Sequence, residues 1–222
     1  MCSSDLSPIV VFADADFEKA VAAVISGFTH NAGQCCIATS RLLVEQTVAE
    51  DFKALLYSRL AMKTLVQPVA TSSQFEKVKG YIEQGKMAGK LLFEGEYPIE
   101  SEGFFVAPAV FEYNDPEFML ACEEIFGPVL VMRTFENEEE AVSFANETEY
   151  GLAASVWSLD LNKASRVARR IRAGRLWINS QQDNFPELPV GGYNASGIGR
   201  EAGIQGILAY SELKTVIIDT RN

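Results

Sequence analysis

The sequence predicts an α/β protein with a mainly parallel, doubly wound sheet and flanking helices. Two observations lead to this fold class. Short apolar runs alternate with amphipathic stretches of helix length almost throughout the 222 residues. The first run, residues 9–12, is apolar at consecutive positions, as expected of a strand buried on both faces. The sequence contains no internal repeat, low-complexity segment or linker, which indicates one main domain.

The helix starts are marked by side chains that can accept hydrogen bonds from backbone N–H groups. Residues 7–12 are predicted to form the first strand, and Asp14 or Asp16 then caps the first helix. Asn137 and Asp160 are expected to cap two later helices. The first helix has one apolar face, formed at three- and four-residue spacing by Phe17, Val21, Val24 and Phe28.

The remaining elements follow from periodicity and from turn residues. Further strands are expected at residues 42–44, 91–93, 104–111, 128–133, 153–157, 175–179 and 214–219. Further helices are expected at residues 47–60, 73–88, 117–124 (a short helix or turn), 137–146, 160–174 and 201–210. Thr47 and Glu50 resemble a capping box, and Gly89 and Gly174 suit helix ends. Pro108 cannot donate to a sheet, so it should lie at an edge or at a strand end.

The charge balance excludes one class of partner. Nineteen Lys and Arg residues stand against thirty Asp and Glu residues, and the formal net charge is -11. Nucleic-acid binding requires a basic surface, so no nucleic-acid partner is expected. No apolar run reaches the roughly 18 residues of a membrane span, so no membrane partner is expected. Residues 1–6 lack the features of a signal peptide and are predicted to be an artificial or disordered extension.

The four cysteines are Cys2, Cys35, Cys36 and Cys122. Adjacent cysteines do not suit a disulfide framework, and no Cys-x-x-Cys pattern or Cys/His cluster indicates a metal site. This usage is typical of a reduced, cytoplasmic protein.

The turn at residues 28–41 holds two cysteines and the only histidine, His30. A thiol at such a turn suits a nucleophile, but a buried, inert cysteine is the simpler interpretation. A Cys/His hydrolase would have to pair Cys36 with His30. The base of such a pair usually comes from elsewhere in the chain, so a structural or surface histidine is favoured.

Two other segments allow a functional and a structural interpretation. Residues 197–202 fit Gly-x-Gly-x-x-Ala, which resembles a dinucleotide fingerprint. They follow a long loop instead of a strand, so close packing of glycines is the favoured interpretation. Residues 122–129 place two carboxylates beside an aromatic ring and a Gly-Pro turn. They suit either a ligand contact or an acidic helix end.

Several of these segments together resemble the NAD(P)-dependent aldehyde dehydrogenases. Residues 33–36, Gly-Gln-Cys-Cys, with Arg41 match the active-site signature Gly-Gln-x-Cys, and residues 123–129 match a second motif of the family. Further matches follow in the family's order at Asn146, residues 150–152, residues 174–179 and residues 189–201. The resemblance covers residues 7–222 and implies the catalytic-domain type of the α/β fold. Residues 189–201 resemble the betaine-aldehyde or amino-aldehyde branch.

The resemblance implies a role for particular residues. Cys36, the fourth position of Gly-Gln-x-Cys, would be the nucleophile, with Cys35 as its neighbour. Glu124 would hold the nicotinamide ribose of NAD or NADP, and Phe126 would pack near the nicotinamide. Cys36 would form a thiohemiacetal with the aldehyde, and oxidation by the cofactor would leave a thioester that water hydrolyses. Residues 181–190 would line the substrate channel.

The sequence departs from the family's pattern in three respects. Residues 61–72 are shorter than the family's usual loop, and Asn194 stands where a Lys is usual. The family's N-terminal half, with the Rossmann-type cofactor fold, the oxyanion Asn and the general-base Glu, lies outside the match. Residues 7–212 are therefore expected to be a catalytic domain that does not turn over by itself.

Two rival functions stay open. The parent enzyme could be a CoA-acylating or phosphorylating relative, in which the thioester is not hydrolysed. The chain could also be a truncated, non-catalytic binding or structural protein. Residues 213–222 resemble the family's oligomerisation strand, so a homo-oligomer is expected through this strand. The other expected partner is a small aldehyde substrate.

Overall fold

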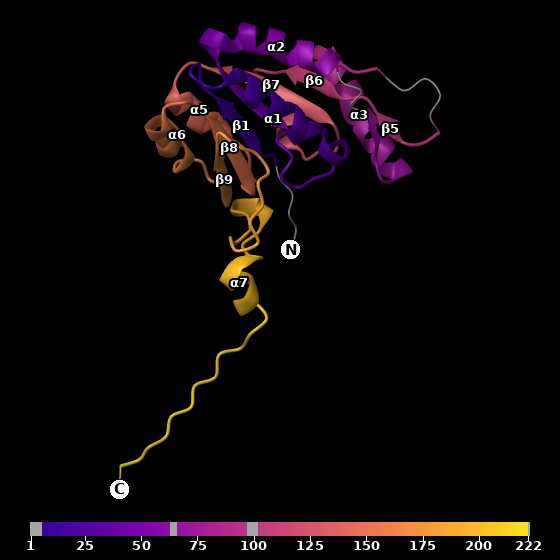
Figure 1. The fold of residues 1–222 in the computed structure, drawn as a ribbon. Coiled ribbons are helices and arrows are strands. Elements are labelled where there is room, and N and C mark those ends of the chain that lie inside the picture. The colour runs from indigo at the N-terminus through magenta and orange to yellow at the C-terminus, as the bar shows by residue number, and fades with distance from the viewer. Residues whose placement is uncertain (1–5, 63–65, 97–101, 222) are drawn as a thin grey trace.

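The computed structural model describes residues 6–62, 66–96 and 102–221. Its main strands are β1 (Pro8–Val11), β2 (Arg41–Glu45), β4 (Lys90–Glu94), β6 (Ala109–Glu112), β7 (Val129–Phe135), β8 (Ala153–Trp157) and β9 (Arg175–Ile178). They form one sheet in the order β4-β6-β7-β2-β1-β8-β9 (Figure 1). All neighbouring pairs are parallel except β4 with β6. The predicted α/β fold with a mainly parallel sheet is confirmed.

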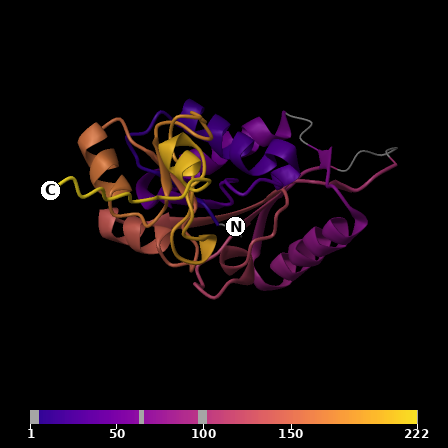
Figure 2. The ribbon, with the colours of Figure 1, turned by 90° about the horizontal axis from the view of Figure 1, so that it is seen from below.

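Helices cover both faces of the sheet, which explains the continuous apolar runs of the strands. The helices are α1 (Phe17–Thr29), α2 (Ala49–Ala61), α3 (Ser72–Ala88), α4 (Met119–Cys122), α5 (Glu138–Ala145), α6 (Leu161–Ala168) and α7 (Gly203–Leu208). Ile9 and Val11 pack with α1 and α2 on one face, whereas Val10 and Phe12 pack with α5 and α6 on the other. Helices α3 and α4 cover that second face beside β6 and β7. Figure 2 shows the indigo α1 and the magenta α3 on opposite sides of the sheet.

Three predicted helix caps are present. Asp16, and not Asp14, caps α1 by accepting from the backbone N–H of Lys19. Asn137 caps α5 and Asp160 caps α6 in the same way. Asp14 instead accepts hydrogen bonds from the loop that follows β8.

The capping box predicted from Thr47 and Glu50 is wrong. Helix α2 begins at Ala49, and Val48 stands at its N-cap without a side-chain hydrogen bond. The Thr47 hydroxyl donates to Glu45 Oε1 at 3.2 Å, so it is not available to the helix. A short 3₁₀ turn, Gln46–Val48, occupies the place where the box was expected.

Residues 104–111 do not form one strand, because Pro108 interrupts them. The first part, β5 (Phe105–Val106), pairs antiparallel with the two-residue strand β3 (Gln67–Pro68) in a separate small sheet. The second part is β6, which begins directly after Pro108. The missing N–H of proline therefore falls at the break between two strands, where no ladder bond is needed.

Gly174 does not close the helix that Asp160 begins, since α6 already ends at Ala168. A Cβ built on Gly174 would lie 1.8 Å from the carbonyl oxygen of Gly191. The glycine is needed for this close approach of two chain segments, and not for a helix end.

Both chain ends differ from the sequence-based expectation. Leu6 is buried and its carbonyl accepts from Arg41 Nε, so the domain includes this residue, while residues 1–5 lie outside the described part. The strand predicted at residues 214–219 is not formed in this single chain. Figure 1 shows the segment extending away from the sheet, and its apolar side chains are exposed. Among the described residues, no strand lies beside this segment to accept its backbone hydrogen bonds.

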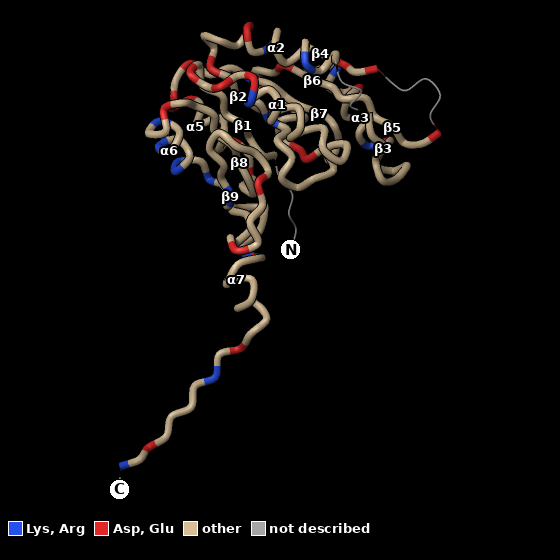
Figure 3. The backbone as a smooth tube through the Cα atoms, in the orientation of Figure 1, with Lys and Arg blue, Asp and Glu red and all other residues tan. Residues whose placement is uncertain are grey.

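Ion pairs between charged side chains connect α5 with the α6 segment, on the same face of the sheet. Arg166 of α6 and Arg170, which follows this helix, form ion pairs with Glu138 and Glu139 in the first turn of α5, at 2.6 and 2.5 Å. Figure 3 marks the basic positions of the α6 segment and the acidic positions near α5 along the backbone. Within the described residues, no helix is both long and apolar enough to cross a membrane.

Candidate functional site

Two motif-bearing turns meet at one edge of the sheet. The cysteine turn, residues 34–40, leads into β2, and the turn at residues 123–128 leads into β7. Strands β2 and β7 are parallel neighbours, with Arg41 opposite Val131. Both turns therefore lie at the amino ends of the strands, which we call the amino edge.

The approach to the cysteine turn is held in an unusual backbone conformation. Asn31, Ala32 and Gly33 have φ angles of 52°, 55° and 72°, all in the left-handed region. A Cβ on Gly33 would lie 2.1 Å from the carbonyl oxygen of Gly127. The absence of a side chain at Gly33 is thus what lets the two motifs pack backbone against backbone.

The two thiols of the turn are half-buried and interact with each other. A hydrogen bond from the Cys36 thiol lowers the pKa of Cys35 to about 6, against the opposing effect of burial. The backbone N–H of Ile37 and the electrostatic attraction of His30 act in the same direction. The structure therefore favours loss of one proton from this cysteine pair near neutral pH, a property that adjacency in the sequence did not indicate.

The second turn presents Glu124 and Phe126 at the same edge. Phe126 has a φ of 58°, and 37% of its surface is exposed. Gln74 Nε2 donates to the carbonyls of Ile125 and Phe126 at 2.9 and 2.8 Å, and Lys77 Nζ donates to the Glu124 carbonyl at 3.1 Å. These bonds from α3 fix the strained backbone and leave the aromatic ring partly exposed.

The three residues singled out by the resemblance are not equally close in the structure. A narrow cavity is lined by Cys35, Glu124 and Phe126 together with other residues of the two turns, and Cys36 is not among them. Cys36 instead acts electrostatically on Arg175, the first residue of β9, and raises the pKa of its guanidinium against the larger, lowering effect of burial. In the described part of the chain, no group of three or more His, Cys, Asp or Glu side chains is placed to hold a metal ion.

The loop after β9 runs back and contacts the cysteine turn. Gln181 Nε2 donates to the hydroxyl of Thr39 at 3.0 Å, and Thr39 is fully buried. Both side chains press against Gly27 of α1, where a Cβ would lie 2.0 Å from Thr39 Oγ1. Gln181 belongs to residues 181–190, which were expected to line the substrate channel, whereas Arg175 was not singled out by sequence reasoning. The available signal for Arg175 was a charge at the start of an apolar strand.

Arg41, the arginine of the first motif, has a structural role. Its side chain is fully buried at the start of β2. It donates to the carbonyls of Leu6, Phe144 and Ala145 at 2.8–2.9 Å. It thereby joins the entrance of β1 to the C-terminal end of α5, where unpaired carbonyls attract a cation.

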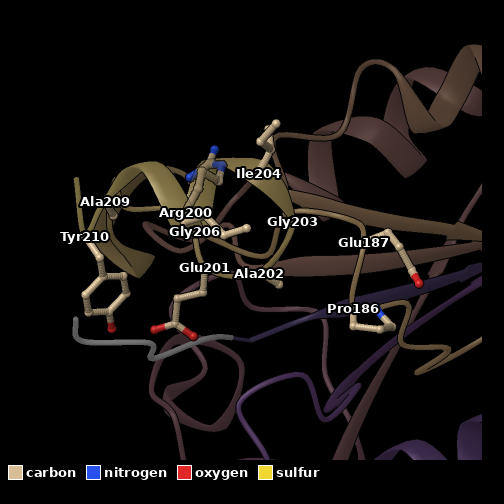
Figure 4. A pocket seen from close by; sticks show the side chains of 11 residues that line it. Pro186, Glu187, Arg200, Glu201, Ala202, Gly203, Ile204, Gly206, Ala209 and Tyr210 are labelled. Carbon is tan, nitrogen blue, oxygen red and sulfur yellow. The ribbon is translucent and has the colours of Figure 1, made fainter. Parts of the chain in front are cut away.

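The glycine-rich stretch at residues 197–202 lies away from both turns. It follows a 3₁₀ turn, Asn194–Ser196, and not a strand of the sheet, so a dinucleotide fingerprint is not supported. An open groove formed with residues 186–187 and α7 contains Arg200 and Glu201 (Figure 4). None of Cys36, Glu124 and Phe126 lines this groove.

Comparison with known proteins gives the context of this site. The sequence pattern of the aldehyde dehydrogenase family matches residues 5–216. The chain belongs to the aldehyde dehydrogenase family. Aldehyde dehydrogenase (NAD(P)+) 1 of Saccharomyces cerevisiae is 40% identical, over 96% of this chain and 45% of the yeast protein. The chain spans about half the length of the curated relatives it matches.

Solved structures of the aldehyde dehydrogenase family share the fold. An NAD-dependent aldehyde dehydrogenase from Sinorhizobium meliloti has a TM-score of 0.88 and 43% identity, covering 95% of this chain and 44% of that one. Betaine aldehyde dehydrogenase from Staphylococcus aureus, solved in complex with NAD+, has the same TM-score at 35% identity, covering 93% of this chain and 44% of that one. The family resemblance predicted from the ordered motifs is confirmed.

Proposed function

We propose that this chain forms the thiol-bearing part of an enzyme that oxidises an aldehyde to a carboxylic acid with NAD+ or NADP+. The observation that carries the proposal is the contact of Gly33 with Gly127, which packs the cysteine turn against the Glu124–Phe126 turn. Family membership supports the same reaction class.

In the proposed mechanism, Cys36 Sγ attacks the aldehyde carbon and forms a thiohemiacetal. The proton of Cys36 can pass to Cys35, which already accepts its hydrogen bond. The chemistry that NAD+ or NADP+ supplies when bound is acceptance of a hydride. Oxidation of the thiohemiacetal leaves a thioester on Cys36. Water then hydrolyses the thioester to the carboxylic acid and the free thiol.

The residues of the second turn fit a nicotinamide cofactor by their chemistry. A carboxylate, as in Glu124, accepts hydrogen bonds from the hydroxyls of a ribose. The partly exposed ring of Phe126 offers an apolar surface on which a flat heterocycle can pack. We assign these two residues to the nicotinamide side of the cofactor, and no further cofactor contact is assigned to the described residues.

The experiment that tests the proposal compares the complete enzyme with this chain. In the complete enzyme, Cys36→Ala should lower kcat by at least about a thousandfold, since no other group replaces the nucleophile. Cys122→Ser is the matched control and should leave turnover unchanged. Residues 1–222 alone should not reduce NAD+ or NADP+ with any of a panel of aldehydes. Cys36-dependent turnover by this chain, or full activity of Cys36→Ala, would contradict the proposal.

We further propose that residues 213–222 pair with a second copy of the chain. The segment is extended and carries exposed β-branched side chains, among them Val216, Ile217 and Ile218. Light scattering should show an oligomer, and deletion of residues 213–222 should give a monomer. The proposed location is the cytoplasm, where thiols stay reduced, and Cys35, Cys36 and Cys122 form no disulfide in the described part of the chain.

A further inference from the structure

Arg175 is a cation placed at the amino edge, in electrostatic reach of the candidate nucleophile. It is the first residue of β9 and is half-buried. Burial lowers the pKa of its guanidinium, and the attraction of Cys36 opposes that shift. Because β9 and β2 run in the same direction, the start of β9 lies at the same edge as the cysteine turn.

The guanidinium of Arg175 is held in one orientation by two contacts. Its Nη1 donates to Asn184 Oδ1, and its central carbon lies 5.6 Å from the ring centroid of Trp177. Trp177 Nε1 donates to the carbonyl of Asp183 at 3.0 Å, which fixes the returning loop beside β9. Asn184 belongs to residues 181–190, the segment expected to line the substrate channel. Gln181 of the same segment donates to Thr39 of the cysteine turn, so the segment that holds Arg175 also contacts this turn.

No carboxylate within the described residues forms an ion pair with Arg175. The carboxylate in the same loop, Asp183, accepts from the Ser180 hydroxyl. Arg175 donates one Nη1–H to Asn184, and the planar guanidinium has further N–H groups that can donate to a ligand. A partly desolvated guanidinium without a carboxylate partner suits an external carboxylate, because its fork matches two carboxylate oxygens.

We propose that Arg175, supported by Asn184, makes this site selective for aldehydes that carry a carboxylate on the same molecule. The inference rests on the proposed function for the reaction, and it adds the charge of the substrate. It differs from the betaine-aldehyde branch that residues 189–201 resemble, since the substrate of that branch is a cation, which Arg175 repels.

The first test measures the charge near Cys36 without any turnover. In a Cys35→Ser background, Cys36 is alkylated by iodoacetate, an anion, and by iodoacetamide, its neutral analogue, and the modified peptide is quantified. A change in thiolate fraction affects both reagents equally, so the ratio of the two rates reports the local charge. Arg175→Gln should lower the iodoacetate to iodoacetamide ratio about three- to tenfold. Arg175→Lys should keep most of the ratio.

Arg169→Gln, at an exposed position just after α6, is the matched control and should leave the ratio unchanged. Circular dichroism of each variant separates a charge effect from misfolding, and Arg175→Lys keeps the test decisive if the Gln variant does not fold. An unchanged ratio in folded Arg175→Gln, or an equal fall in Arg169→Gln, overturns the proposal.

The second test uses the complete enzyme and three aldehydes: succinic semialdehyde, butanal and betaine aldehyde. Wild-type kcat/KM should be highest for the anion, and Arg175→Gln should lower the preference for succinic semialdehyde over butanal at least about tenfold. Equal selectivity in both proteins overturns the assignment of Arg175 but not the proposed function. Failure to oxidise any aldehyde overturns the proposed function, and the alkylation ratio then still decides the role of Arg175.

Discussion

The two edges of the parallel sheet are built in opposite ways. At the carboxyl edge, the loops after β1 and β8 are joined by hydrogen bonds to Asp14. Its carboxylate accepts from the Ser158 hydroxyl, the Asp160 backbone N–H and Lys163 Nζ at 2.8–3.0 Å. At the amino edge, the backbone is held in left-handed conformations at Asn31 and Phe126.

This difference supports the proposal that the chemistry takes place at the amino edge. Open α/β sheets generally bind ligands at the carboxyl ends of their strands. Here that edge is closed by caps and ion pairs, whereas the thiol pair, the partly exposed Phe126 and Arg175 lie at the opposite edge. Asn31, Ala32 and Phe126 at the amino edge have left-handed backbone, a conformation that is common at functional sites.

The largest expected effect at the amino edge comes from replacing the buried Arg41. Arg41→Met leaves the carbonyls of Leu6, Phe144 and Ala145 without their donor. The free energy of unfolding should fall by about 3–5 kcal/mol. Denaturant unfolding measures this change, with exposed Arg169→Met as control. A loss below about 1 kcal/mol would show that Arg41 does not hold β1 and α5 together.

Gly33→Ala tests the contact between the two turns. The change adds a Cβ at a φ of 72° and against the Gly127 carbonyl, so unfolding should become easier by about 2–4 kcal/mol. Gly80→Ala in α3 is the matched control, because a Cβ there meets nothing within 4 Å. That variant should be stabilised by about 0.5–1 kcal/mol. Equal effects at the two glycines would remove the argument for backbone contact.

Asp14→Asn acts on the carboxyl edge alone. Burial raises the pKa of Asp14, but bonds from Lys163, Asp160 and Ser158 outweigh it and hold the pKa below its ordinary value of 3.8. The contribution to stability is therefore complete above pH 3.8 and is lost as the pH falls through the lowered folded-state value. We expect a loss of about 1 kcal/mol at neutral pH, because the group is partly exposed to solvent.

The pH dependence of unfolding checks this prediction for Asp14→Asn, which should show a shallower acid decline than the wild type. The alkylation rates of Cys35 and Cys36 at the amino edge should be the same in Asp14→Asn as in the wild type. A change in those rates would mean that the two edges are coupled.

Cys36→Ala should have the smallest effect on stability and a clear effect on its neighbour. Without the Cys36 thiol, the pKa of Cys35 should rise from about 6 toward its ordinary value of 9.0. The midpoint of Cys35 alkylation against pH measures this shift, and Cys122→Ser should not move it. A midpoint that stays near pH 6 would assign the low pKa to Ile37 and His30 instead.

Much of the fold could be predicted from local signals. The run at residues 9–12 and the cap at Asp160 are local and strong, and both are present in the structure. Residues 104–111 were predicted as one strand because each part has strand composition, although Pro108 divides them between two sheets. Residues 214–219 have strand composition as well, but a strand needs a neighbour, and no described strand lies beside them.

The sequence by itself determined the alternation of strands and helices along the chain and the motifs that indicate the family, because these depend on neighbouring residues. Only the tertiary structure decided which groups meet. The hydrogen bond within the Cys35–Cys36 pair depends on side-chain orientation, which adjacency does not specify. Arg175 starts at the same edge of the sheet as the cysteine turn because β9 runs in the same direction as β2, although the two segments are far apart in the chain. The charges around the site therefore depend on the position and direction of each strand in the sheet, which a local sequence pattern does not predict.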